Sequence, residues 1–227
     1  MKFINIEGLD GSGKSTQIKL LKEYFEKNDV AYQYLHFPRT DSPIYGELVA
    51  KFLRGDLGDM ESVNPYLIAL IYAGDRNDAK NTINKWLNED YLVLLDRYVY
   101  SNIAFQCAKL DKKEEIEKLS NWIKHLEYEY FQIPKPEVEL FLDVPIEFTE
   151  RNLNKDRKGS DRKYLQGKED IHEQNIEFQK KVRNIYLQEI TNEPDFHKIE
   201  CYNEQNQILG PEIIKKRILE YIKPLLS

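Results

Sequence analysis

Residues 8–15, "GLDGSGKS", bring three glycines together with Lys14 and Ser15. They follow an apolar stretch and precede a segment of helical periodicity, which is the context that the motif G-x-x-x-x-G-K-[ST] requires. Such glycines let successive backbone N–H groups turn toward one phosphate, and the helix N-terminus adds its dipole. Lys14 is expected to reach the outer phosphates, and the Ser15 hydroxyl to be offered to Mg²⁺. The motif therefore predicts a bound nucleotide, held by Gly8, Leu9, Asp10, Gly11, Ser12, Gly13, Lys14, Ser15 and Thr16.

A second group of charged residues, "DRY" at 96–98, follows the apolar run 91–95. If that run is a strand, Arg97 lies at the carboxyl edge of the sheet, where it faces the active crevice and is placed to hold a second phosphate. Two phosphate-binding devices on one edge indicate transfer between two phosphorylated molecules. The chain has no guanine-reading N-K-x-D motif and no second domain to drive, which argues against a GTPase or a motor.

Short apolar strands alternate with helical patterns along the chain, so the sequence predicts an α/β fold with a parallel sheet sandwiched by helices. The strands are expected at 2–6, 31–37, 91–96, 138–144 and 196–202. The helices are expected at 15–28, 44–54, 65–88, 99–110, 112–130, 146–153, 171–190 and 211–226.

Composition describes a globular protein of one domain, because the chain has 227 residues, of which 41% are hydrophobic and 32% charged. The formal charge of −6 argues against a general nucleic-acid binder. No apolar run approaches the roughly 20 residues of a membrane span. The opening "MKFINIEG" is too soon interrupted by Glu7 to be a signal peptide. We therefore expect a cytoplasmic protein in which Cys107 and Cys201 are buried or inert.

The segment 154–170 differs from the rest, because it is charged, punctuated by glycine and nearly devoid of apolar residues. It is either a solvated loop or a mobile lid that closes over the phosphates.

Several short motifs occur in an order that resembles the thymidylate kinases over essentially the whole chain. They are "EGLDGSGKSTQ" (7–17), "FPR" (37–39), "YAGDR" (72–76), "DRYVYSNIAFQ" (96–106), "IPKPEVELFLDV" (133–144) and "DIHEQ" (170–174). The chain is most similar to the bacterial branch, and residues 160–173 are similar to forms from the Bacteroides group. The resemblance implies one P-loop nucleoside monophosphate kinase domain over residues 1–227, with a lid at about 154–170. It also implies the Mg²⁺-dependent reaction ATP + dTMP → ADP + dTDP in a homodimer, with Ser15 and Asp96 holding the metal.

The resemblance gives roles to the charged residues at the phosphates. Asp10 would face the acceptor sugar and pair with Arg97, since a carboxylate beside phosphates needs such a counter-role; a solvated turn residue is the alternative. Arg97 and Arg39 would bind the acceptor phosphate through paired guanidinium donors. An ordinary exposed arginine remains the competing interpretation of Arg39.

The acceptor base and sugar would contact residues from three segments. Tyr72 and Arg76 share a helix face, so Tyr72 could stack on a pyrimidine and Arg76 donate to a base carbonyl. Asn102 both donates and accepts, as the imide edge of thymine requires, and Phe105 would close the space of a 2′-hydroxyl. Tyr72 and Phe105 could instead be core aromatics, and Ser101 a helix-start residue. The predicted dTMP-binding set is Asp10, Phe37, Arg39, Tyr72, Arg76, Arg97, Tyr98, Ser101, Asn102 and Phe105.

Negative charge spreads over the phosphoryl group as it moves, and a cation must lie near it. Some members of the family carry an arginine inside the phosphate loop, but this chain has Gly11 and Ser12 there. The candidates, in order, are Arg162, Arg157 and Arg151, so the predicted catalytic set is Asp10, Lys14, Arg97, Arg162, Arg157 and Arg151.

Two alternatives to a thymidylate kinase remain on the sequence. One is a kinase of another nucleotide or of a nucleoside, although two phosphate-binding arginines favour a nucleotide acceptor. The other is a non-catalytic, nucleotide-dependent regulatory protein.

Overall fold

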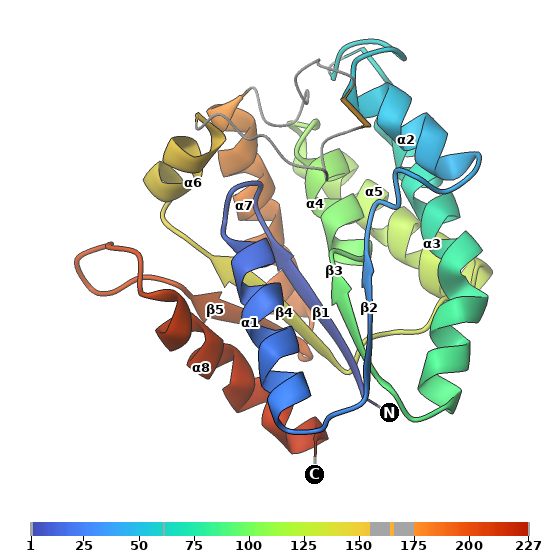
Figure 1. Cartoon of the computed structure of the whole chain (residues 1–227). Coiled ribbons are helices and arrows are strands. Elements are labelled where there is room, and N and C mark those ends of the chain that lie inside the picture. The colour runs from blue at the N-terminus through green and yellow to red at the C-terminus, as the bar shows by residue number, and fades with distance from the viewer. Residues whose placement is uncertain (1, 61, 155–163, 166–174, 227) are drawn as a thin grey trace.

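Five parallel strands form one sheet in the order β2-β3-β1-β4-β5 (Figure 1). The computed structural model describes residues 2–60, 62–154, 164–165 and 175–226. The strands are β1 (Phe3–Gly8), β2 (Tyr32–His36), β3 (Leu92–Asp96), β4 (Val138–Asp143) and β5 (Phe196–Glu200). The predicted fold class is therefore confirmed, and each strand lies within two residues of its expected bounds.

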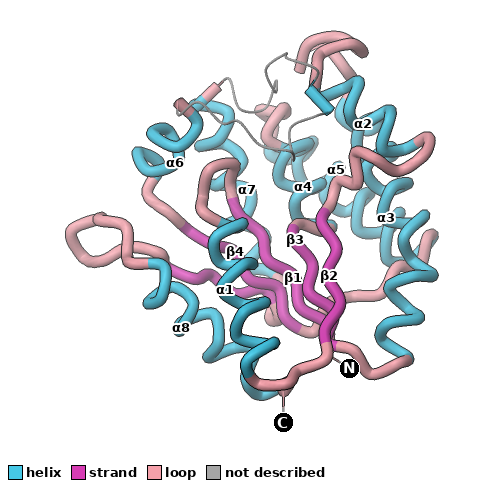
Figure 2. The backbone as a smooth tube through the Cα atoms, in the orientation of Figure 1, coloured by secondary structure: helices cyan, strands magenta, loops and turns pink. Residues whose placement is uncertain are grey.

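Helices cover both faces of this sheet, as Figure 2 shows. They are α1 (Lys14–Lys27), α2 (Tyr45–Leu53), α3 (Pro65–Asn88), α4 (Val99–Cys107), α5 (Lys113–Lys124), α6 (Ile146–Leu153), α7 (Ile176–Asn192) and α8 (Pro211–Ile222). A π-helix, η1 (His125–Tyr130), continues α5, and a 3₁₀ turn, η3 (Lys223–Leu225), follows α8. Among the described helices, none has both the length and the apolar composition of a membrane span.

Alternate side chains of the central strands point to opposite faces and build two cores. Ile4 and Ile6 pack with residues of α1 and α8 in one core. Phe3 packs with residues of α4, α5 and α7 in the other. Asn5 and Glu7 share the parity of Phe3, so they face the same side of the sheet as Phe3 does. Both are fully buried there. A carboxylate buried at this point needs donors from the covering helices.

Three predicted helices end differently in the structure. The helix expected at 211–226 is α-helical only to Ile222, where the 3₁₀ turn follows. The helix expected at 99–110 stops at Cys107, and Leu110 N instead closes a turn onto Cys107 O at 3.0 Å. The helix expected at 112–130 is α-helical only to Lys124 and becomes the wider π-helix from His125. The first residues of the helix expected at 171–190 lie outside the described residues, and α7 begins at Ile176 after Asn175, whose side chain caps it.

Both cysteines are free and buried, as expected. Burial raises the pKa of Cys107 and of Cys201 to about 12, so neither thiol is reactive near neutral pH.

Candidate active site

The phosphate loop joins the carboxyl end of β1 to the first turn of α1. Gly11 and Gly13 have φ of 75° and 88°, values that a residue with a side chain rarely adopts. The Lys14 ammonium lies inside the loop and donates to Gly8 O at 3.1 Å and Leu9 O at 2.9 Å. Burial, followed by repulsion from Arg97, lowers the pKa of Lys14 to about 8. The loop thus holds a cation whose donors can turn from these carbonyls to a phosphate.

Arg97 connects the phosphate loop to the segment after β3. Its Nη2 donates to Asp10 Oδ1 at 2.6 Å, which is the ion pair that the sequence led us to expect. Its Nη1 donates to Ser101 Oγ at 3.0 Å, and its guanidinium lies 5.1 Å from the centre of the Phe105 ring. Arg97 has φ of 69°, an unfavourable backbone for a side chain of this size, and its N–H donates to Ile6 O at 3.0 Å. Such strain is frequent at functional sites.

Glu7 of β1 holds the same region through hydrogen bonds, although the sequence analysis assigned it no role. Its carboxylate accepts from the backbone N–H of Tyr98 at 2.8 Å and of Ser101 at 3.1 Å. It also accepts from the hydroxyls of Ser101 and Tyr186, at 2.5 and 2.9 Å, and from the Asn5 amide at 2.9 Å. Glu7 therefore fixes the start of α4, and with it the segment that carries Arg97. We call Glu7, Asp10, Arg97 and Ser101 the phosphate-side cluster.

Asp96 and Ser15 fit the chemistry of a magnesium site. Burial alone would raise the pKa of Asp96, but the hydrogen bond and charge of His36 and the charges of Lys14 and Arg97 lower it below its usual value. Asp96 is therefore a carboxylate at neutral pH. Its Oδ1 is buried and has no hydrogen-bond partner among the described residues, while Oδ2 lies 3.3 Å from His36 Nδ1. Asp96 thus offers an anionic oxygen beside the phosphate loop, and the exposed Ser15 follows Lys14 at the end of that loop. Oxygen ligands of this kind suit a hard cation.

Arg39 follows Phe37 and Pro38, which are joined by a cis peptide bond. Its side chain donates to Asp75 Oδ1 at 2.9 Å and to Asp78 Oδ2 at 2.6 Å, and its backbone N–H donates to Asp75 Oδ2 at 2.8 Å. Arg39 is thus held against α3 by two carboxylates and is not a free surface arginine.

A second buried group joins α3, α4 and the π-helix. Arg76 donates through Nε and Nη2 to Glu127 Oε2 and Oε1, at 2.5 and 2.6 Å. Asn102 Nδ2 donates to the same Oε1 and to Ala69 O, both at 3.0 Å. Burial alone would lower the pKa of Arg76, but the charge and hydrogen bonds of Glu127 raise it above the usual value. We call Arg76, Asn102 and Glu127 the base-side cluster, after the role expected of the first two.

The aromatic residues predicted near the acceptor lie at different depths. Tyr98 is fully buried between Phe3 and Phe37, with ring centres 5.8 Å from each, and its hydroxyl donates to Pro134 O at 3.1 Å. Phe37 is buried in the same core. Both therefore pack the site from behind. Tyr72 is half-buried beside the small core of α2 and α3, and Phe105 packs against Phe178 at 6.1 Å.

These elements match a family model over residues 6–209, and that model describes thymidylate kinase. The chain belongs to the thymidylate kinase family. A thymidylate kinase of Mycobacterium tuberculosis is 31% identical over 187 residues, covering 82% of this chain and 84% of that one. The probable thymidylate kinase 1 of Saccharolobus solfataricus is 32% identical over 219 residues, covering 96% and 98%. A solved structure of the thymidylate kinase of Candida albicans has the same fold, with a TM-score of 0.71, 22% identity and coverage of 98% and 91%.

Of the three arginines considered for the thymidylate kinase lid, the structure describes only Arg151, since Arg157 and Arg162 lie outside the described residues. Arg151 is exposed on α6, and its Nε donates to Glu147 O at 3.3 Å. The neighbouring Asn152 instead reaches the phosphate loop and donates to Gly11 O at 2.8 Å. Sequence reasoning missed Asn152, because an asparagine near the end of a helix carries no signal of such a contact.

Two described residues within the expected lid contact the rest of the thymidylate kinase fold. Tyr164 packs with the α2–α3 core that includes Tyr72, and its carbonyl accepts from Arg54 Nη1 at 2.6 Å. Leu165 is buried. Residues 164–165 are therefore tied to the α2–α3 core, beside the helix that carries Tyr72 and Arg76.

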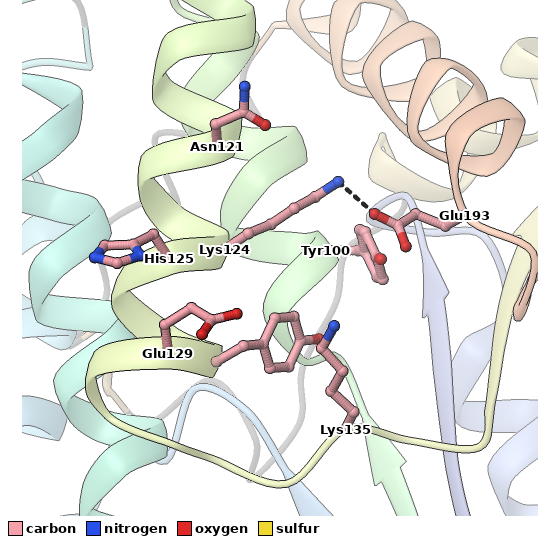
Figure 3. A pocket seen from close by; sticks show the side chains of 8 residues that line it. Tyr100, Asn121, Lys124, His125, Glu129, Lys135 and Glu193 are labelled. Carbon is pink, nitrogen blue, oxygen red and sulfur yellow. Dashed lines mark hydrogen bonds and ion pairs between the residues drawn. The ribbon is translucent and has the colours of Figure 1, made fainter.

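A separate cavity of about 380 Å³ lies away from these groups (Figure 3). Lys135 and Glu193 in its wall precede β4 and β5, which places the cavity toward the amino edge of the sheet, opposite the phosphate loop. Its Lys124 pairs with Glu193 at 2.6 Å. None of the residues predicted for ATP or dTMP lines it.

Proposed function

We propose that this protein transfers the terminal phosphoryl group of ATP to dTMP, giving ADP and dTDP. The observation that carries the proposal is the 2.6 Å ion pair between Asp10 of the phosphate loop and Arg97 after β3. This pair joins the phosphate loop to a second buried cation at one edge of the sheet, which supports transfer between two phosphorylated molecules. Membership of the thymidylate kinase family supports dTMP as the acceptor.

The donor is held by the loop residues 8–16, with Lys14 on the outer phosphates. Once ATP is bound, Lys14 exchanges the carbonyls of Gly8 and Leu9 for phosphate oxygens. Ser15 and Asp96 would hold Mg²⁺, which would supply positive charge at the phosphates when bound. The protein's own contribution is the free Asp96 oxygen and the buried positive charge of Lys14 and Arg97.

The acceptor phosphate is held by Arg97, whose position Asp10, Ser101 and Glu7 fix. Arg39 contributes only if the nucleotide draws its guanidinium from Asp75 and Asp78, because both carboxylates occupy it in this structure. The pyrimidine stacks on Tyr72 and is read by Arg76 and Asn102, and Phe105 fills the space of a 2′-hydroxyl. Tyr98 and Phe37 support this pocket from the core.

We also propose that residues 1–227 form one kinase domain in which segment 154–170 is a lid. Closure of the lid brings an arginine to the moving phosphoryl group, in the order of preference Arg162, Arg157, Arg151. Such an arginine contributes roughly 10³–10⁵-fold to turnover in related transfers. Each of the three arginines should be replaced by alanine in a separate variant and assayed at saturating substrates. We expect one of the three variants to lose most of its turnover. Nearly normal turnover in all three would rule this arrangement out.

A cytoplasmic homodimer of the bacterial, Bacteroides-group type completes the proposal. Leu67 and Leu70, three residues apart on α3, are 60% and 43% exposed, and exposed apolar side chains of this kind favour a partner surface. Sedimentation of the wild type and of Leu67→Lys tests this. We expect the wild type to be a dimer that the lysine charge weakens. A protein that is monomeric in both cases would contradict the dimer.

The test of the function is a coupled assay of ADP release with each nucleoside monophosphate as acceptor. We expect the highest kcat/KM with dTMP and no turnover with the nucleoside thymidine. Preference for another monophosphate would make the protein a different nucleotide kinase, and the absence of turnover with every acceptor would make it a nucleotide-dependent regulatory protein.

A further inference from the structure

Glu127 is a fully buried glutamate of the π-helix. It is not among the residues to which the proposed function gives a role. Its two oxygens receive three hydrogen bonds, two from Arg76 and one from Asn102. A π-helical turn is uncommon and is frequently found at functional sites. This turn places Glu127 between the two residues expected to read the acceptor base.

The hydrogen bonds around Asn102 settle which way its amide faces. Nδ2 lies 3.0 Å from Glu127 Oε1 and 3.0 Å from Ala69 O, and both of those atoms only accept. The amide nitrogen must therefore face them, and Oδ1 points away from both. Asn102 Oδ1 is buried and has no hydrogen-bond partner among the described residues. A buried acceptor without a donor is costly unless a ligand supplies one.

Arg76 complements this acceptor. Glu127 occupies its Nε and Nη2, and the remaining nitrogen, Nη1, makes no hydrogen bond to another described side chain or carbonyl. The base-side cluster thus presents one free acceptor, Asn102 Oδ1, and one free donor, Arg76 Nη1.

This pair matches one class of pyrimidine edge. Thymine and uracil carry an N3–H donor beside the O4 acceptor, whereas cytosine carries the N3 acceptor beside an N4 amino donor. With cytosine, the N4 amino donor would face the donor Arg76 Nη1, and the N3 acceptor would face the acceptor Asn102 Oδ1. Neither pair can form a hydrogen bond. A site built to pair with polar groups rejects strongly a ligand that cannot pair with them.

We propose that Glu127 is a specificity-determining positioning residue that makes this site select a 4-keto pyrimidine over a 4-amino pyrimidine. It does so by locking the Asn102 amide with Oδ1 free and the Arg76 guanidinium with Nη1 free. The inference rests on the proposed function, in that it takes the acceptor base to be bound here. The 5-methyl group has no part in it, so these atoms treat thymine and uracil alike.

Glu127→Gln tests the lock with a nearly equal shape. A glutamine N–H₂ in place of Oε2 opposes Arg76 Nε, and in place of Oε1 it opposes both Arg76 Nη2 and Asn102 Nδ2, so it faces a donor in either orientation. Asn102 or Arg76 then shifts, and the free acceptor and donor are no longer fixed. We expect the ratio of kcat/KM for dTMP over dCMP to fall by about tenfold or more. The change should lie mainly in the KM for dTMP, with the KM for ATP unaltered.

Glu189→Gln is the matched control. Glu189 is also a buried glutamate, and it accepts from Ser120 Oγ and pairs with Lys124, each at 2.7 Å, but it does not contact Arg76 or Asn102. Its replacement should lower stability and leave the dTMP over dCMP ratio unchanged. If Glu127→Gln does not fold, Glu127→Asp serves instead, because a side chain one methylene shorter cannot reach both partners at once.

The outcomes separate this inference from the proposed function. A wild type that does not prefer dTMP contradicts the proposed function. A wild type that prefers dTMP, with a Glu127 variant that is slower on both acceptors at an unchanged ratio, overturns the inference and makes Glu127 a structural residue only.

Discussion

The phosphate-side and base-side clusters are each built around a buried glutamate, but the two glutamates hold different things. Glu7 accepts from two backbone N–H groups at the start of α4 as well as from neutral side chains. Glu127 accepts only from side chains, two bonds of a guanidinium and one of an amide. The first therefore fixes where a chain segment lies, and the second fixes which atoms of a pocket are donors and which are acceptors. Position governs the rate for every acceptor, whereas donor–acceptor pattern governs the choice among acceptors.

The largest effect should come from Glu7→Gln. A glutamine can keep its oxygen on the Tyr98 and Ser101 N–H groups only by turning its N–H₂ toward the Ser101 and Tyr186 hydroxyls, which must then accept instead of donate. Because Ser101 Oγ also accepts from Arg97 Nη1, we expect this rearrangement to displace Arg97. A displacement of about 1 Å costs about 10²-fold in turnover, so we expect kcat to fall by that order with dTMP and dCMP alike. Steady-state kinetics with both acceptors would measure this. A changed ratio at a preserved rate would contradict the division between the clusters.

Glu139→Gln is the control for that variant. Glu139 neighbours Glu7 across Asn5, and burial together with the charge of Glu7 raises its pKa well above the usual range. Its surroundings therefore favour the neutral acid, and an amide of the same shape should leave turnover nearly unchanged.

Tyr72→Ala should act on the base side alone. Stacking of a base on an aromatic ring contributes about 1–3 kcal/mol, so loss of the ring should raise the KM for dTMP by about tenfold. The KM for ATP should hardly change. Initial rates with each substrate varied in turn would decide, and a larger shift for ATP would place this helix outside the acceptor pocket.

A pH titration tests the phosphate side through Lys14. Its pKa in the free protein is about 8, lowered by burial, and only the ammonium binds phosphate well. Affinity for ATP should therefore be constant at lower pH and fall about tenfold by one pH unit above that pKa. Calorimetry of ATP binding across this range should also detect proton uptake. Lys14→Arg stays charged, so a similar decline in that variant would assign the titration to another group.

Titration of Lys14 should change the free energy of unfolding in the opposite direction to the affinity for ATP. The unfolded chain holds the Lys14 proton up to about pH 10.4, whereas the folded chain releases it from about pH 8. The contribution of Lys14 to the free energy of unfolding should therefore increase between these two values.

Phe105→Ala should have the smallest effect, because Phe105 offers only apolar and ring contacts, against Arg97 and Phe178. Its loss should open room for a 2′-hydroxyl and narrow the preference for dTMP over its ribose analogue by a few-fold, since a single apolar contact discriminates weakly. Competition between the two substrates would measure the ratio, and an unchanged ratio would make Phe105 a core residue.

The sequence predicted the fold well, because alternating apolar strands and amphipathic helices carry strong periodic signals. The resemblance to the thymidylate kinases also led us to expect the Asp10–Arg97 pair, which the structure contains. It did not predict Glu127, although the spacing of four from Leu119 and Ile123 places that residue on the buried face of the helix. Glu7 was overlooked for a similar reason, because a carboxylate in a buried strand reveals a need for donors but not which donors arrive.

The residues proposed for the acceptor show what the sequence pattern could not predict. Arg39 and Arg76 have motif-like neighbours, but only the tertiary structure shows that Asp75, Asp78 and Glu127 occupy most of their donors. Tyr98 belongs to a conspicuous triplet, yet the twist of the chain after β3 turns its ring into the core.

The central claim is that one loop serves two substrates, with Lys14 facing the donor and Asp10 facing the acceptor through Arg97. Equilibrium binding of a non-hydrolysable ATP analogue and of dTMP to Asp10→Asn and Lys14→Ala tests it most directly. We predict that Asp10→Asn binds the ATP analogue nearly as the wild type does but loses affinity for dTMP and turns over slowly. Lys14→Ala should instead lose the ATP analogue. An equal loss of affinity for the ATP analogue in both variants would contradict the account.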